Sequence, residues 1–276
     1  MILVTGATGN VGAALVRVLA DAGVPVRALT RTLDPPGLPD GVQAVAADLN
    51  RPDSLSAALA GVRGVFLLSG YADMPGLLTT IRDARVRRVA LLSSGAVVDG
   101  DIENAVVRYN VLSEAAVRES GVPWTILRPS GFHSNTLQWA PQLRDGDVVR
   151  EPFADVPITA IDPVDIAAVA ALTLTTQGHD QAAYRLTGPE PIRPADRLRV
   201  LARLLDRDLQ LVPLTNAQAR TQMNATMPAA YADAFYSFFA DGTYDDSQVD
   251  PTTERLLGRA PRTFEQWATE HVDDFR

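Results

Sequence analysis

The sequence has no cysteine, and all 25 of its basic side chains are arginine, so lysine is absent as well. Without cysteine the chain has no disulfide, no thiolate nucleophile and no cysteine-bound metal. A coding bias that replaces lysine by arginine at solvated positions explains the missing lysine. Whatever its origin, the absence excludes any chemistry that needs a lysine amine.

The sequence also lacks a hydrophobic run of about eighteen residues, the length that crosses a membrane. The apolar segment at Met1 has neither a basic leader nor a cleavage site, so we expect a cytoplasmic protein without a membrane partner. The net charge of −8 disfavours nucleic acid as a partner, because phosphate neutralisation needs a basic face. Histidine is scarce, and His133, His179 and His271 are too far apart for a helical metal site, so no metal is predicted.

What the sequence does have is an alternation of short apolar runs and helical patterns over about its first 130 residues. Expected strands cover residues 2–5, 24–29, 42–46, 64–68, 88–92 and 124–127, and expected helices cover 11–22, 54–60, 75–84 and 105–119. This alternation is typical of a parallel sheet with helices on both faces. We therefore predict an α/β fold with a doubly wound parallel sheet of the Rossmann type.

Beyond Pro129 the pattern loosens, because several prolines break the chain before an alanine-rich helix expected at about 164–175. Residues 184–186 and 209–212 are short strand candidates in a tail that is otherwise mostly helical. We predict a sheet domain over residues 1–155. Residues 156–276 are predicted to form a smaller, mainly helical substrate lid that is partly interleaved with the sheet.

Three glycines lie between the first expected strand and the first expected helix, in the run Gly6-Ala7-Thr8-Gly9-Asn10-Val11-Gly12. Glycine lets the backbone approach a pyrophosphate, and the amino terminus of the helix presents free N–H groups to it. The alternative is a tight turn without a ligand, but a glycine run between a strand and a helix favours dinucleotide binding. The predicted cofactor contacts here are Gly6, Thr8, Gly9, Asn10, Val11 and Gly12.

The residue that ends the second strand indicates which dinucleotide is bound. An acidic residue there binds the ribose 2′-hydroxyl of NAD, whereas an arginine suits the 2′-phosphate of NADP. The end of the second strand and the residues after it read Arg27-Ala28-Leu29-Thr30-Arg31, and no acidic residue follows before Asp34. Arg31 fits a phosphate because its planar donors bind two oxygens at once, although it could also be a solvated loop residue. We predict NADP(H) as the cofactor.

The spacing G-x-x-G-x-x-G resembles that of the short-chain dehydrogenase/reductase superfamily, particularly its extended and atypical branches. The resemblance implies that Asp48 and Leu49 contact the adenine ring of the cofactor. It also implies that Ser69 and Ser93, at the ends of the fourth and fifth strands, lie beside the ribose and the nicotinamide.

Ordinary members of that superfamily use a Tyr-x-x-x-Lys pair on the helix after the fifth strand, with a serine at the strand's end. When Glu114 is aligned with the acid that often follows the lysine by four positions, the tyrosine slot falls on Val106 and the lysine slot on Asn110. Both catalytic residues are then absent.

Two other residues remain as catalytic candidates. Tyr109 lies three positions after the tyrosine slot, nearly one helical turn away, and the alternative to a catalytic role is packing or a contact with the lid. Ser94 matches the position of the catalytic serine, and the alternative is that it only caps the loop. Both residues stay on the list of candidates for catalysis.

The pattern as a whole, with residues 121–129 and 161–167 added, resembles the NmrA-like atypical branch over the chain up to about Gly188. That branch includes NADPH-dependent quinone reductases, reductases and isomerases of specialised metabolism, and NADP-sensing regulators. Departure from the tyrosine and lysine pattern is common in it. The resemblance therefore supports cofactor binding more firmly than it supports one reaction.

The substrate pocket is expected just after Arg128-Pro129, where Phe132, His133 and Trp139 follow in one segment. A second group of aromatic residues, between 231 and 239, forms either the core of the lid or the wall of a flat hydrophobic pocket. We expect a small hydrophobic substrate, held under the helical lid. The sequence leaves the oligomeric state open.

Our leading hypothesis is an NADPH-dependent oxidoreductase that transfers hydride to a hydrophobic quinone, enone or carbonyl compound. Such a transfer can proceed by positioning alone when the acceptor is electrophilic and water supplies the proton. One alternative is a regulatory protein that senses NADP(H) without turnover. Another is a non-redox cyclase, isomerase or lyase of specialised metabolism on the same fold.

Overall fold

The computed structural model describes residues 1–32, 35, 37–99 and 101–276, so Asp34 lies outside the described residues. The chain folds into two compact units. The first, which we call the sheet unit, consists of residues 1–97, 109–129 and 163–185, and the second, the helical unit, consists of residues 98–108, 130–162 and 186–276. A boundary near residue 155 would place residues 130–155 with the sheet, whereas their contacts place them in the helical unit.

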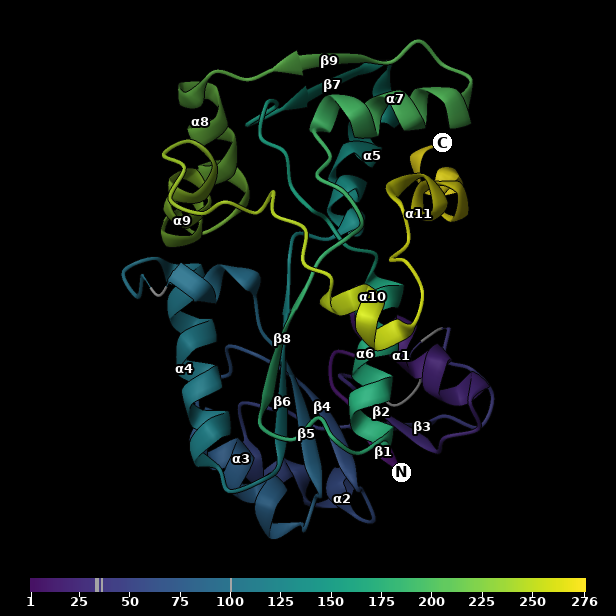
Figure 1. Cartoon of the computed structure of the whole chain (residues 1–276), viewed down its shortest axis with the longest axis vertical. Coiled ribbons are helices and arrows are strands. Elements are labelled where there is room, and N and C mark those ends of the chain that lie inside the picture. Colours follow the sequence, from purple (N-terminus) through teal and green to yellow (C-terminus); the bar gives the residue numbers. More distant parts are fainter. Residues whose placement is uncertain (33–34, 36, 100) are drawn as a thin grey trace. The chain divides into compact units, whose positions relative to one another are not determined.

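The sheet unit is built on a seven-stranded sheet with the order β3-β2-β1-β4-β5-β6-β8. Its strands are β1 (Ile2–Val4), β2 (Val26–Thr30), β3 (Gln43–Ala46), β4 (Gly64–Leu68), β5 (Arg88–Leu92), β6 (Trp124–Pro129) and β8 (Ala182–Leu186). The pairs from β3 across to β6 are all parallel, with Leu3 facing Arg27 of β2 and Val65 of β4. The predicted doubly wound parallel sheet is confirmed (Figure 1).

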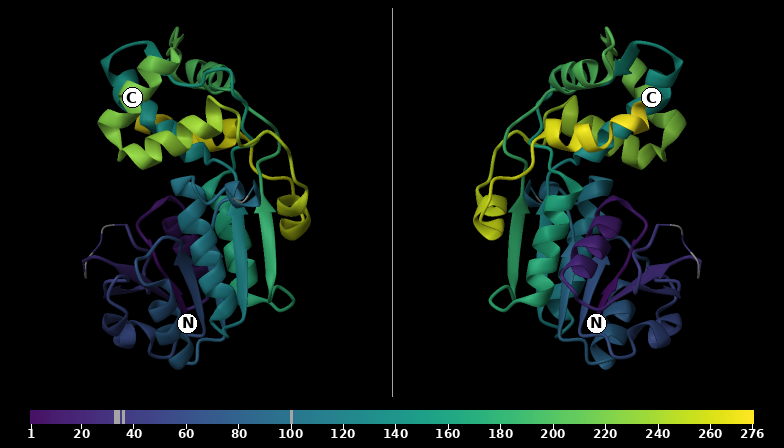
Figure 2. Two further views of the ribbon diagram at one scale, coloured as in Figure 1. Left: turned by 90° about the vertical axis from the view of Figure 1, so that its left-hand side faces the viewer. Right: turned by 90° about the vertical axis from the view of Figure 1, so that its right-hand side faces the viewer.

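The helices of the sheet unit are α1 (Asn10–Asp21), α2 (Ser56–Leu59), α3 (Met74–Asp83), α4 (Ala105–Glu119) and α6 (Pro163–Thr175), with short 3-10 helices η1 (Pro52–Leu55) and η2 (Gly95–Asp99). The first turn of α4 and the end of η2 belong to the helical unit. They cover both faces of the sheet (Figure 2). On one face α1 packs against α6, and its buried side chains Val11, Leu15 and Leu19 recur every four residues along the helix.

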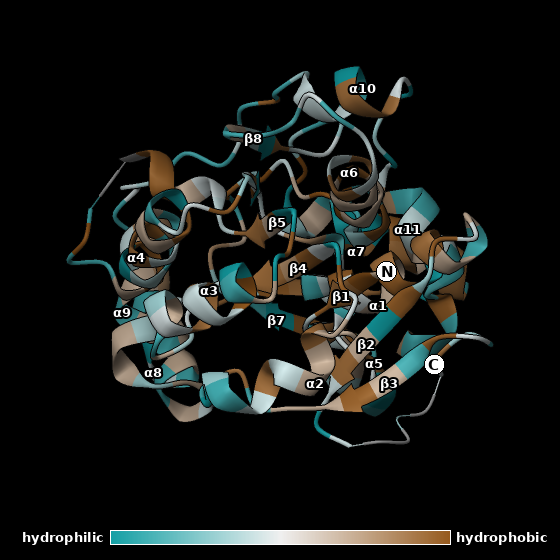
Figure 3. Ribbon diagram, turned by 90° about the horizontal axis from the view of Figure 1, so that it is seen from below, coloured by the Kyte–Doolittle hydropathy of each residue, from teal (hydrophilic) through white to brown (hydrophobic). Residues whose placement is uncertain are grey.

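The opposite face of the sheet carries an apolar core that extends across four of its strands. Leu3, Val65, Leu91 and Ile126 come from four neighbouring strands and are almost completely buried. Side chains from α2, α3 and α4 pack on them, because alternate residues of each strand point to this face. The hydropathy view shows these strands as apolar segments between more polar helices (Figure 3).

The helical unit has its own core and a two-stranded parallel sheet, β7 (Val148–Glu151) with β9 (Gln210–Pro213). Its helices are η3 (His133–Trp139), α5 (Ala140–Asp145), α7 (Pro194–Leu205), α8 (Asn216–Thr226), α9 (Ala229–Phe239), α10 (Thr252–Leu257), α11 (Phe264–Glu270) and η4 (Val272–Phe275). Trp139, Leu201, Trp267 and Phe275 are fully buried in its core. Among the described residues, no helix has the length and hydrophobicity needed to cross a membrane.

Candidate functional site

The glycine turn joins β1 to α1 and brings its backbone into very close contact. Gly6 has φ of +60°, which favours glycine. A Cβ atom added to Gly12 would lie 2.0 Å from the Gly6 carbonyl oxygen, whereas one added to Gly9 would lie 3.3 Å from the same oxygen. Position 12 therefore admits only glycine, since backbone rather than a movable side chain blocks it.

The amino terminus of α1 is built to receive an anion. Its N-cap residue, Gly9, has no side chain to bind the first N–H groups, and the first turn contains no acidic residue. The helix dipole adds positive potential at the same place. Thr8, Gly9 and Asn10 are exposed there, while Val11 and Gly12 are buried against the sheet. This arrangement, next to the point between β1 and β4 where the strand order reverses, fits a dinucleotide pyrophosphate.

The two arginines at the second strand have different environments. Arg27 lies within β2 and donates through Nη1 to the carbonyl oxygens of Ala58 at 2.7 Å and Ala60 at 2.9 Å, so it holds the end of α2. Arg31 directly follows β2, is exposed and makes no hydrogen bond or ion pair with any residue that the structure describes. Of these two arginines, Arg31 is the one without a partner in the part of the chain that the structure describes, and its side chain therefore suits a phosphate.

The other residues assigned to the cofactor by resemblance occupy loops at the ends of β3 and β4. Asp48 is exposed, and its Oδ1 accepts from the backbone N–H of Asn50 at 2.9 Å. Leu49 is buried in the core below the sheet. Ser69 donates from Oγ to the carbonyl oxygen of Leu92 at 2.8 Å, so it ties the end of β4 to the end of β5.

Ser93 belongs to a buried network that centres on Glu114 of α4. Its Oγ donates to Glu114 Oε1 at 2.7 Å, and Arg128 of β6 binds both carboxylate oxygens at 2.9 and 2.6 Å. Arg118 binds Oε2 at 2.7 Å. Burial acts to raise the pKa of Glu114, but the bonds and charges of Arg128, Ser93 and Arg118 outweigh it and lower that pKa below its ordinary value. This network fixes α4 against β5 and β6.

The slots for the usual catalytic pair are closed in the structure. Val106 and Asn110 are both buried, at 8% and 2% exposure, and neither side chain has a titratable group. The Tyr109 ring lies against Gly70, where an added Cβ would be 3.2 Å from its Cδ2 atom. Ser94 is half-buried and accepts from the N–H of Ala96 at 3.2 Å, which is a loop-capping contact.

Tyr71, in the loop after β4, is a further candidate residue for the functional site, and the sequence patterns do not single it out. Its hydroxyl hydrogen-bonds to the Thr5 side chain, which directly precedes the glycine turn. Burial raises the pKa of Tyr71, so the phenol stays protonated. Only the pairing of β1 with β4 brings positions 5 and 71 together, and no local pattern marks them.

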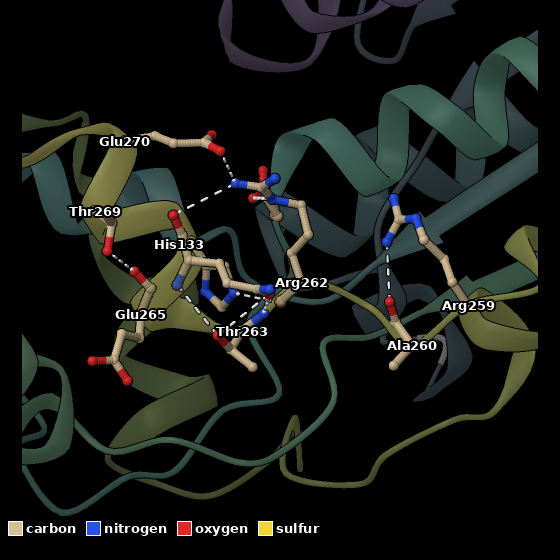
Figure 4. Close-up of polar contacts among 10 residues, drawn as sticks. His133, Arg259, Ala260, Arg262, Thr263, Glu265, Thr269 and Glu270 are labelled. Atoms are coloured by element: carbon tan, nitrogen blue, oxygen red, sulfur yellow. Dashed lines mark hydrogen bonds and ion pairs between the residues drawn. The ribbon is translucent and has the colours of Figure 1, made fainter.

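The residues expected in the substrate pocket lie in the helical unit. His133 is 1% exposed and packs against Phe264 and Trp267, with ring centroids 5.5 and 6.3 Å away. Burial lowers its pKa to about 4, so the ring is neutral at pH 7. Figure 4 shows it beside Arg262, whose guanidinium pairs with Asp162 and Glu270. Phe132 lies half-buried just before it.

Trp139, from the same segment, is fully buried and donates from Nε1 to Glu151 Oε2 at 2.6 Å. Glu151 lines a cavity of about 480 Å³ within the helical unit, together with Asn135 and Gln138 of η3. Two members of the aromatic group, Phe235 and Phe239, line this cavity as well, whereas Phe238 is buried. No cluster of three or more metal-binding side chains occurs in the part of the chain that the structure describes.

Comparison with known proteins shows that the chain is similar to proteins that bind NAD(P)H. A family model described as NAD(P)H-binding matches residues 6–177. A (4-alkanoyl-5-oxo-2,5-dihydrofuran-3-yl)methyl phosphate reductase of Streptomyces griseus is 41% identical over 282 residues, which cover 100% of this chain and 99% of that protein.

Two solved structures have the same fold. One is an NADPH-dependent quinone oxidoreductase of Escherichia coli in complex with NADPH, with 22% identity, a TM-score of 0.79 and coverage of 99% of this chain and 100% of that one. The other is NmrA, a negative transcriptional regulator, with 20% identity, a TM-score of 0.75 and coverage of 99% and 95%.

Proposed function

The chain belongs to the NAD(P)H-binding family, and we propose that it is an NADPH-dependent reductase of hydrophobic conjugated carbonyl compounds, the class that includes enones and quinones. The observation that carries the proposal is the glycine turn between β1 and α1, combined with the closed Val106 and Asn110 slots. The chain can bind the cofactor but has no tyrosine and lysine pair to protonate a simple ketone. An acceptor that is already electrophilic suits such a site.

The relative from Streptomyces griseus supports this choice of substrate class. Its named substrate is a methyl phosphate ester in which an unsaturated five-membered ring has an alkanoyl group and a ring carbonyl. A carbon–carbon double bond conjugated to carbonyl groups accepts hydride readily, because the negative charge moves onto oxygen. We extend this class of acceptor to the present chain, with which that protein aligns over nearly its whole length.

In this mechanism the chain's own residues bind and orient the cofactor and the acceptor. NADPH supplies the hydride when bound. The N–H groups at the start of α1 hold the pyrophosphate, and Arg31 binds the 2′-phosphate. Ser94 donates a hydrogen bond to the developing oxyanion of the acceptor, and water provides the proton. Tyr109 packs over the loop after β4 and does not transfer a proton.

Mixing the purified protein with NADPH and a panel of quinones, enones and unsaturated furanones tests the proposal through the loss of NADPH absorbance. We expect consumption with at least one conjugated acceptor and none with a saturated ketone. Tight NADPH binding without oxidation by any acceptor would refute the reductase and favour an NADP(H) sensor.

Replacing Arg31 with alanine tests the cofactor preference. A lost hydrogen bond to a charged group is worth about 1.5–3 kcal/mol, so the Kd for NADPH should rise by roughly ten- to a hundredfold while that for NADH stays unchanged. Arg82→Ala is the matched control, because Arg82 is an exposed arginine that pairs with Asp83 at the end of α3. An equal loss of affinity for both cofactors, or no loss, contradicts the assignment.

A further inference from the structure

The cavity of about 480 Å³ in the helical unit has the size of a small-molecule site. Its apolar wall includes Phe153, Ile158, Met223, Met227, Phe235 and Phe239. Methionine side chains adapt their shape, and aromatic rings offer flat surfaces. The wall therefore suits an alkyl or acyl arm of variable length.

Backbone strain marks one side of this wall. Phe153 has φ of +55°, a conformation that bulky residues rarely adopt. Its ring packs against Phe239 at 5.6 Å and Tyr236 at 6.2 Å between centroids. Residues held in such conformations cluster at ligand sites, because the surrounding structure keeps them there for a purpose other than stability.

The polar end of the cavity contains an arginine with a donor to spare. Arg197 of α7 is 4% exposed, and its Nη1 donates to Thr136 Oγ1 at 3.2 Å. Its guanidinium carbon lies 5.2 Å from the centre of the Trp139 ring. The Nε–H is buried and has no hydrogen-bond partner among the described residues. A buried N–H without an acceptor is costly, and an oxygen of a ligand would satisfy it.

The charged side chains in the cavity wall determine which kind of ligand oxygen the cavity can bind. Glu151, 6% exposed, lies at the same end, where Trp139 donates to Oε2 at 2.6 Å and Gln138 to Oε1 at 3.5 Å. One carboxylate and one guanidinium balance each other among the described wall residues. A phosphate ester carries a charge of about −1.5 to −2, which Glu151 would repel and Arg197 would attract, so the pair gives phosphate no net attraction, whereas a carbonyl oxygen needs only a donor.

We propose that this cavity binds the neutral carbonyl end and apolar arm of the reductase's acceptor, with the Arg197 guanidinium donating to the carbonyl oxygen and Glu151 offsetting the attraction of Arg197 for phosphate. This inference rests on the proposed function for the identity of the acceptor. It goes beyond that function by naming the residues that select the acceptor and the part of it that they bind.

The test measures ligand binding to the full chain by calorimetry, with NADP⁺ present so that no turnover occurs. Three probes are compared: a hexanoyl hydroxymethyl dihydrofuranone, its phosphate ester, and the analogue in which the hexanoyl ketone is reduced to a methylene. Arg197→Gln should raise the Kd of the ketone by about ten- to a hundredfold and leave that of the methylene analogue unchanged. Arg199→Gln, an exposed arginine on the same helix, should change neither.

Two further measurements keep the proposal testable if Arg197→Gln folds poorly. Lengthening the acyl arm should tighten binding by about fourfold per methylene until the cavity is full. Glu151→Gln, which keeps an oxygen for Trp139, should improve the affinity of the phosphate ester relative to the neutral alcohol by about threefold or more, because it removes a repelling charge from the cavity. Affinity that ignores arm length, or a phosphate ester that already binds more tightly than the alcohol through Arg197, overturns the proposal.

The two proposals fail in distinguishable ways. If NADPH is never oxidised but the carbonyl probe still binds in an Arg197-dependent manner, the reductase is refuted and the site stands. If conjugated acceptors are reduced with a KM that does not depend on Arg197, the site is refuted and the reductase stands.

Discussion

Replacing Glu114 with glutamine should destabilise the sheet unit strongly. The substitution keeps one acceptor oxygen but turns the other into an NH₂ group, which then faces arginine donors. At least two charge-assisted bonds of about 1.5–3 kcal/mol each are lost. Arg118 and Arg128 are 40% and 22% exposed and regain part of their hydration. We therefore expect a loss of about 3 kcal/mol, in line with the cost of breaking a buried ion pair.

Urea denaturation at pH 7 measures the free energy of unfolding, and hydrogen exchange of peptides from β5, α4 and β6 confines the readout to the sheet unit. The melting temperature should fall by roughly 6–12 °C. Glu119→Gln is the control, because Glu119 is an exposed neighbour on the same helix, and its effect should stay within about 0.5 kcal/mol. A Glu114→Gln variant as stable as this control would refute the reasoning.

The stabilising effect of Glu114 should also depend on pH, and the Glu114→Gln variant tests this. Because the pKa of Glu114 is lower in the folded chain than its ordinary value of 4.5, the network stabilises the fold above pH 4.5. That stabilisation is lost as the pH falls through the folded-state pKa. The difference in stability between the wild type and Glu114→Gln should therefore shrink below pH 4.5. A constant difference down to acid unfolding would show that the carboxylate charge is not what stabilises the network.

Two other predictions concern the glycine turn and the buried histidine. Gly12→Ala should abolish NADPH binding in a fluorescence titration, because the added Cβ would lie 2.0 Å from the Gly6 backbone oxygen. Gly9→Ala should weaken NADPH binding less, because its Cβ would lie 3.3 Å from the same oxygen. Equal effects of the two substitutions would contradict the steric argument. Because the pKa of His133 falls from 6.5 to about 4 on folding, the wild type should lose up to about 3 kcal/mol of stability between pH 6.5 and pH 4. His133→Leu should flatten this part of the urea stability profile, and an unchanged slope would exclude His133 as its source.

Much of the sheet unit could be predicted from the sequence, since its signals are local. The strands at residues 64–68 and 88–92 and the helix at 105–119 have the predicted bounds. The helix expected at 54–60 is instead a 3-10 turn, Pro52–Leu55, followed by Ser56–Leu59. The strand Val148–Glu151 was missed, because a four-residue strand paired with residues 62 positions away leaves no local pattern.

What the sequence determined by itself is the glycine turn, the parallel sheet and the loss of the usual catalytic pair, because each depends on residue types at fixed short spacings. Only the tertiary structure decided what the polar residues do. It engaged Ser93 with Glu114, tied Tyr71 to Thr5, and placed Arg197 and Glu151 at one cavity from segments about 46 residues apart. One signal for Arg197 was present, since it lies on the apolar stripe of α7 with Leu198 and Leu201. An arginine on such a stripe must find a partner in three dimensions, and sequence spacing does not identify that partner.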